Sequence, residues 1–155
     1  MKARRNIADL SIGIVALTVV VALTLPPSLQ GKWATNESSA IATLRSLHQA
    51  QMSYAQALPT RGFADDLVKL HPRLEAAASP GDEKLNFLRN CAAQPCEISG
   101  YLFAIDQTSG TPVDTFRITA VPAMPGKTGI RGFCASSAGV ISYDPEGGKT
   151  CSYAI

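Results

Sequence analysis

The chain has 155 residues, enough for a terminal anchor and one small domain with a single core, but not for two domains. Its formal net charge of +2 comes entirely from the first nine residues, because the chain from Lys32 onward carries eleven basic and eleven acidic side chains. Such a balance argues against a nucleic-acid partner, since phosphate binding needs a basic excess on one face.

An uncharged run extends from Leu10 to Gly31. As a helix, about twenty apolar residues cross a hydrocarbon core of about 30 Å, so residues 1–31 are predicted to form a basic tip and a transmembrane helix. A cleaved secretory signal is disfavoured because LTLPPSLQGKW offers no small-x-small cleavage site. A buried core helix is disfavoured because a helix that is apolar all round needs a larger protein to cover it.

The basic residues before this run predict its orientation. Lys2, Arg4 and Arg5 would stay in the cytoplasm under the positive-inside rule, so residues 32–155 would form a periplasmic or extracellular domain. The expected location is a single-pass protein of the cell inner membrane, with the lipid bilayer as a partner. Trp33 follows the run directly, either as a membrane-interface aromatic residue or as an ordinary surface or core tryptophan.

Asp9 is the unusual residue at the start of the apolar run. A carboxylate near the beginning of a membrane helix is costly unless it stays at the interface or finds a partner. It either lies at headgroup level beside Arg4 and Arg5, or pairs with a group on another chain.

Pro26-Pro27 removes two backbone donors and should kink or interrupt the helix. A second helix is expected over about residues 36–58, with Thr35 or Asn36 as its cap and Glu37 near its positive end.

The second helix is predicted to be amphipathic, with one face packed on a sheet. Its apolar positions recur at spacings of three or four residues or their multiples: Ile41, Leu44, Leu47, Tyr54 and Leu58. Its opposite face carries Arg45, Gln49 and Gln56.

The rest of the chain predicts a loop region followed by strands. Residues 59–98 are interpreted as loop with short helical turns, one of them around residues 65–70. Residues 99–155 contain four short β-branched or aromatic runs separated by turns, which predict an antiparallel meander. The expected strands are residues 100–106, 115–121, 130–135 and 139–143. The fold class is therefore α+β, with one long helix on a small antiparallel sheet.

The four cysteines all follow the predicted anchor. In an oxidising compartment they would form two disulfides, most economically Cys91 with Cys96 and Cys134 with Cys151. A zinc site with four cysteines is the competing interpretation, but these spacings fit common zinc patterns poorly.

No combination of residues predicts catalysis. His48 lies on the amphipathic helix and His71 precedes a proline, without metal-like spacing, so each is expected to be a satisfied or solvent-facing side chain. Asp144 and Glu146 could supply oxygen ligands to calcium, but a plain turn explains them more simply. The sequence therefore predicts no enzyme, no cofactor and no metal site.

The stretch VVVALTLPPSLQGKWATNESSAIATLRSLHQAQMSYA resembles the N-terminal helix of type IV pilins and type II secretion pseudopilins. The later segments GYLFAID, TFRITAV, PGKTGIRGF and VISYD are similar to the carboxyl half of small pilin-like proteins. The resemblance implies a long helix packed on an antiparallel sheet, and helices that bundle in the centre of a filament. It also implies pilin-like subunits or secretion and pilus assembly proteins as partners. The alternative function is a monomeric, signal-anchored exoplasmic binding module with the same fold.

The resemblance also assigns an assembly role to Asp9. Prepilin peptidase cuts family members after a glycine that precedes a phenylalanine, with a glutamate a few residues later. In register on Pro26, these three positions are Arg4, Arg5 and Asp9, so the acid is kept and the cleavage motif is not. The family glutamate pairs with the amino terminus of a neighbouring subunit.

Overall fold

The computed structural model describes residues 28–70 and 91–155. Almost all of these residues belong to one compact unit, Gly31–Ile155. In chain order the elements are the helix α2 (Ser28–Ala57), a 3-10 turn (Leu67–Leu70), and the strands β1 (Cys96–Ile98), β2 (Tyr101–Ser109), β3 (Thr115–Pro122), β4 (Gly132–Ser136), β5 (Ile141–Asp144) and β6 (Tyr153–Ala154).

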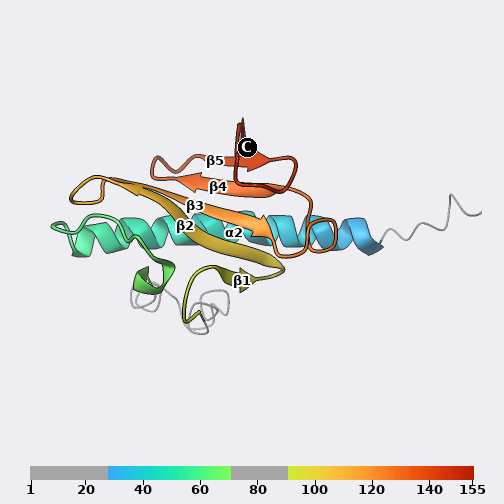
Figure 1. Ribbon diagram of the computed structural model, residues 1–155, viewed down its shortest axis with the longest axis horizontal. Coiled ribbons are helices and arrows are strands. Elements are labelled where there is room, and N and C mark those ends of the chain that lie inside the picture. Colours follow the sequence, from blue (N-terminus) through green and yellow to red (C-terminus); the bar gives the residue numbers. More distant parts are fainter. Residues whose placement is uncertain (1–27, 71–90) are drawn as a thin grey trace, which may run out of the picture. The chain divides into compact units, whose positions relative to one another are not determined.

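The six strands form one antiparallel sheet in the order of the sequence, and α2 lies along one face of it (Figure 1). Each strand therefore pairs with its neighbours in the chain, which makes the sheet a meander. This architecture confirms the α+β class and the packing of one long helix on an antiparallel sheet.

The core lies between α2 and the inner face of the sheet. The helix contributes Leu44, Leu47 and Tyr54, which are at most 6% exposed, whereas Arg45 and Gln49 face solvent. These residues occupy the two sides predicted from the three- and four-residue spacing. The partly buried Ile41 and Leu58 extend the same stripe.

The sheet supplies large side chains at every second position, as a strand with one buried face requires. Cross-strand register brings them together, with Phe103 opposite Ala120 and Ile118 opposite Ala135. The buried residues of this inner face are Tyr101, Phe103, Ile105, Phe116, Ile118, Ala120, Phe133 and Ala135. Burying each large apolar side chain stabilises the fold by roughly 1.5–3 kcal/mol.

On the outer face of the sheet, Thr119 and Cys134 are opposite each other in the register and only 1–2% exposed. The disulfide between Cys134 and Cys151 holds the C-terminal segment against this face. The tail therefore buries outer-face positions that solvent would otherwise reach.

The prediction of four strands is wrong in number. The four expected strands correspond to β2, β3, β4 and β5 with ends shifted by at most three residues, but β1 and β6 were missed. β1 has three residues and β6 has two, too few to show an alternating pattern. β1 also replaces the end of the loop that was expected to extend to residue 98.

The expected start of the helix near residue 36 is also wrong, because α2 begins at Ser28. Thr35 and Asn36 lie within the helix and do not cap it. The hydroxyl of Thr35 donates to the carbonyl of Gly31, one turn earlier, at 2.8 Å. This bond satisfies the hydroxyl inside a continuous helix.

Within residues 28–70 and 91–155, no helix has an apolar stretch long enough to cross a membrane. Residues 1–27, which include Asp9 and most of the predicted transmembrane run, lie outside the described residues. His71 also lies outside them. These expectations remain predictions.

Candidate functional site

Side chains near the start of α2 form hydrogen bonds with the loop between β3 and β4. Trp33, Asn36 and Glu37 are three and four residues apart and therefore share one helix face. The indole Nε1 of Trp33 donates to the carbonyl of Lys127 at 3.0 Å, and the Nδ2 of Asn36 donates to the carbonyl of Thr128 at 2.8 Å. We name these three helix residues and the β3–β4 loop the helix–loop clamp.

Glu37 is the centre of the helix–loop clamp, and its carboxylate is saturated. One oxygen accepts the backbone N–H groups of Ile130 and Arg131, both at 3.2 Å. The other oxygen accepts the Nε of Arg131 at 2.9 Å and its second guanidinium nitrogen at 2.6 Å. The expected role of Glu37 at the helix N-terminus is thus replaced by a charge-assisted contact, in which two guanidinium nitrogens donate to one carboxylate oxygen, with a residue 94 positions away.

Arg131 is held on several sides. Its guanidinium carbon lies 5.5 Å from the ring centroids of both Phe133 and Tyr143, within the range of cation–π attraction. The hydroxyl of Tyr101 donates to the carbonyl of Arg131 at 2.9 Å. Burial raises the pKa of the Tyr101 phenol, and the Glu37 carboxylate raises it further, so Tyr101 remains a neutral donor.

The surroundings of Glu37 act on its pKa in opposite directions. Burial alone would raise it, but the hydrogen bonds from the side chain and backbone of Arg131 and from the backbone of Ile130, with the Arg131 charge, outweigh burial. The pKa of Glu37 is therefore lowered from 4.5. An acid whose pKa is lower in the folded state than in the unfolded state stabilises the fold at pH values above its unfolded-state pKa. This contribution is lost as the pH falls through the folded-state pKa.

Glu37→Gln is expected to reduce the free energy of unfolding by about 1–3 kcal/mol at neutral pH, because a charge-assisted contact is lost. The cost should shrink at a pH of about 3, where protonation progressively removes the same contact in the unmodified protein. Urea unfolding of the full chain at both pH values, followed by circular dichroism, measures the two costs.

Glu97→Gln is the matched control, because Glu97 is exposed on β1 and should change stability little at either pH. An equal cost of Glu37→Gln at both pH values would show that the charge of Glu37 contributes nothing to the helix–loop clamp.

Two glutamine side chains each form hydrogen bonds with both the backbone N–H and the backbone carbonyl of one distant residue. Gln51, fully buried in α2, donates to the carbonyl of Ala64 at 2.9 Å and accepts its N–H at 2.8 Å. Gln94 makes the same pair of contacts with Ile105 of β2, at 3.1 and 3.0 Å. The first fixes the segment after α2, and the second extends the sheet edge beyond β1. Neither pair of contacts is predictable from the sequence, because the partners are set by the tertiary fold.

The cysteines pair as the sequence predicts. Cys91 is bonded to Cys96 and Cys134 to Cys151, with Cα separations of 5.6 and 6.0 Å, both within the range of disulfide geometry. The two bridges lie at opposite ends of the strand order, one at β1 and one joining β4 to the tail.

Asp144 organises a turn. One of its carboxylate oxygens accepts the N–H of Glu146 at 2.9 Å, and the other accepts the N–H of Thr150 at 3.0 Å. Both oxygens are thus engaged by backbone, as the simpler interpretation of this segment expects. In the part of the chain that the structure describes, no cluster of three metal-ligating side chains occurs. His48 is half-buried, and its Nε2 lies 3.3 Å from the carbonyl of Ser137.

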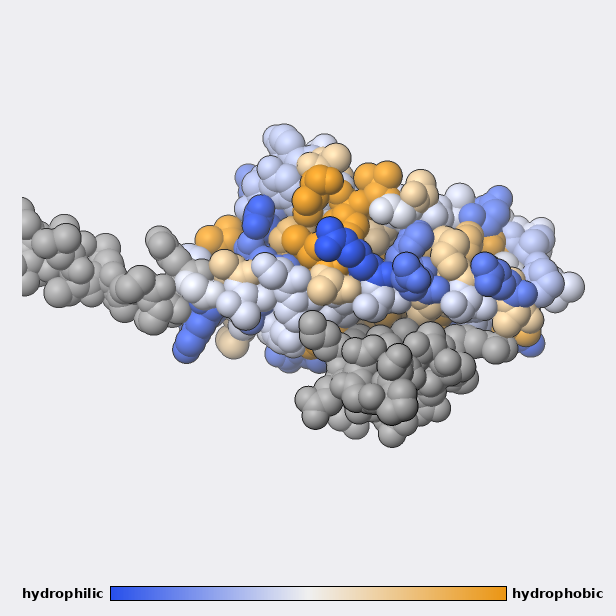
Figure 2. Space-filling model, turned by 180° about the vertical axis from the view of Figure 1, so that it is seen from behind, coloured by the Kyte–Doolittle hydropathy of each residue, from blue (hydrophilic) through white to orange (hydrophobic). Residues whose placement is uncertain are grey.

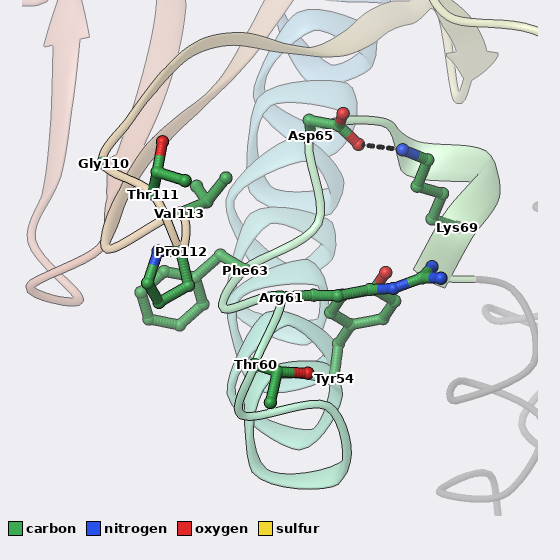
Figure 3. Close-up of a pocket in the computed structure, with 10 residues that line it drawn as sticks. All are labelled: Tyr54, Thr60, Arg61, Phe63, Asp65, Lys69, Gly110, Thr111, Pro112 and Val113. Atoms are coloured by element: carbon green, nitrogen blue, oxygen red, sulfur yellow. Dashed lines mark hydrogen bonds and ion pairs between the residues drawn. The ribbon is translucent and has the colours of Figure 1, made fainter.

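A pocket of about 400 Å³ lies beside the C-terminal end of α2 (Figure 3). The end of the helix and the segment after it form one wall, and the β2–β3 turn forms the other. We name it the distal pocket. Its lining residues are Tyr54, Thr60, Arg61, Phe63, Asp65, Lys69, Gly110, Thr111, Pro112 and Val113.

Comparisons of the chain with protein-family models, with curated proteins and with solved structures find no match.

Proposed function

We propose that the chain is a non-enzymatic, membrane-anchored pilin-like or pseudopilin-like subunit of a type IV pilus or type II secretion type filament. In this proposal residues 1–31 are the anchor, and the domain from Lys32 onward lies outside the cytoplasm. The observation that carries the proposal is the 30-residue helix α2, which begins within the last residues of the uncharged run and packs one face on an antiparallel meander.

Exposed apolar side chains support a subunit that contacts other chains. Val140 and Ile155 are 53% and 62% exposed, and Tyr153 on the edge strand β6 is 55% exposed. The backbone N–H of Ile155 bonds to the carbonyl of Ile141, so the C-terminus lies against β5. Figure 2 shows a gathering of hydrophobic residues on the face seen from behind. Apolar side chains that gather on an exposed face are typical of interaction sites.

The two disulfides support the proposed location. Disulfides form and persist in oxidising compartments such as the periplasm, and are rare in a reducing cytosol. A domain with all four cysteines paired is therefore consistent with export across the membrane.

The test is crosslinking between cysteines placed along residues 12–21, in the otherwise unmodified chain and in Asp9→Ala. If neighbouring helices pack in the bilayer, a partner group on another chain holds Asp9, and removal of the acid should weaken association. We expect strong crosslinks that fall several-fold in Asp9→Ala, measured in cells with the assembly machinery and with the four native cysteines accounted for.

Glu97→Ala is the control, since it removes an exposed acid from β1 and should leave crosslinking unchanged. An absence of crosslinks in every variant would contradict the filament proposal. It would favour the alternative of a monomeric anchored binding module.

A further inference from the structure

We propose that the distal pocket binds a carboxylate carried on a small apolar body, with Arg61 as the group that binds the anion. The lining combines the guanidinium of Arg61 with aromatic and aliphatic side chains (Figure 3). Its volume of about 400 Å³ falls within the range of small-molecule sites. This inference does not depend on the filament proposal.

Backbone contacts hold the two walls of the distal pocket together. The N–H of Phe63 donates to the carbonyl of Val113 at 2.9 Å, and the N–H of Val113 donates to the carbonyl of Arg61 at 3.1 Å. Gly62, between them, has φ of +74°, and a Cβ there would collide with the carbonyl oxygen of Val113. The pocket is therefore preorganised by hydrogen bonds that require a glycine at this position.

The charges of the lining leave one cation available. Lys69 is paired with Asp65 at 2.5 Å, and this hydrogen bond lowers the pKa of the carboxyl and raises that of the amine. Among the residues that the structure describes, Arg61 makes no ion pair. Asp66 also acts on Lys69, so Arg61 is the lining cation that no described carboxylate holds. The planar fork of a guanidinium matches the two oxygens of a carboxylate.

Apolar side chains of the lining define the rest of the ligand. The ring of Phe63 is held edge-on against Phe116 with centroids 4.8 Å apart. Pro112 and Val113 complete the opposite wall. A bare inorganic ion would leave these surfaces uncovered, whereas a carboxylate on a short aliphatic body would bury them.

Two sources share this chemistry, a free organic acid and the C-terminal end of a peptide. Butyrate represents the first and N-acetyl-trialanine the second, and the neutral amide of each is its matched control. The measurement is the shift of backbone N–H resonances of Arg61, Thr111 and Val113 as each probe is titrated into the isotope-labelled full chain. The same titrations are made with Arg61→Gln and with Arg45→Gln, which removes an exposed arginine from the other side of α2.

We expect saturable shifts with at least one carboxylate, weak shifts with its amide, and a loss of affinity of about tenfold or more in Arg61→Gln. Arg45→Gln should bind as the unmodified chain does. Binding of the peptide without butyrate supports the proposal and identifies a chain end as the ligand, whereas binding of both identifies a free acid as sufficient. Equal binding of acid and amide, unchanged affinity in Arg61→Gln, or no saturable shift with either acid would overturn it.

Discussion

Leu47→Ala is expected to destabilise the domain by about 2–5 kcal/mol, the usual cost of a cavity at a fully buried leucine. Leu47 is 0% exposed and lies on the buried face of α2. Because the whole stability of a small domain is about 5–15 kcal/mol, this single change could remove a large part of it. Urea unfolding of the full chain measures the loss, with the fluorescence of Trp33, the only tryptophan, as the signal.

Val140→Ala provides the comparison, because Val140 is 53% exposed and its truncation leaves no internal cavity. We expect a change within about 0.5 kcal/mol for this variant. Similar losses for both variants would mean that α2 is not packed on the sheet as described.

Removal of the bridge between Cys134 and Cys151, by replacing both with serine, is expected to cost about 2–5 kcal/mol. The bridge closes a sequence separation of 17 residues and restrains the unfolded chain. In the folded state it also keeps the C-terminal segment against Cys134 and close to Gly132. The expected result is a lower midpoint of urea unfolding and faster proteolysis of the last ten or so residues.

The bridge between Cys91 and Cys96 is the internal comparison, because its sequence separation is only five. The chain-entropy relation predicts that serine at both of these positions costs about 1 kcal/mol less than the longer bridge. A larger loss of stability on removal of the short bridge would show that this bridge stabilises native packing near β1.

The face of α2 was predictable from the sequence because helix periodicity is local. Leu44, Leu47 and Tyr54 repeat at the spacing of one helix side, and the structure buries them on the sheet. The strands β2 and β3 were predictable for the same reason, since each is a short β-branched or aromatic run with partial alternation that ends at turn residues. The cysteine pairs followed from short separations in the chain.

The helix–loop clamp was not predictable in the same way. Glu37 and Arg131 are 94 residues apart, and no local pattern links an acid on a helix to a basic residue in a distant loop. From its local neighbours alone, Glu37 is therefore expected to act near the helix N-terminus. The one available signal was the grouping of Trp33, Asn36 and Glu37 on one helix side, three polar or amphipathic side chains that a solvent-facing helix would not need together.

The sequence by itself determined the α+β class, the buried side of the helix, the central strands and the cysteine pairs, because these depend on residue spacing along short stretches of chain. Only the tertiary structure decided the edge strands β1 and β6, the partners of Glu37 and Gln51, and the joining of Arg61 to the β2–β3 turn in the distal pocket. Their physical reason is the same in each case. These features are stabilised by hydrogen bonds and charges between segments that meet only after the helix has packed on the sheet.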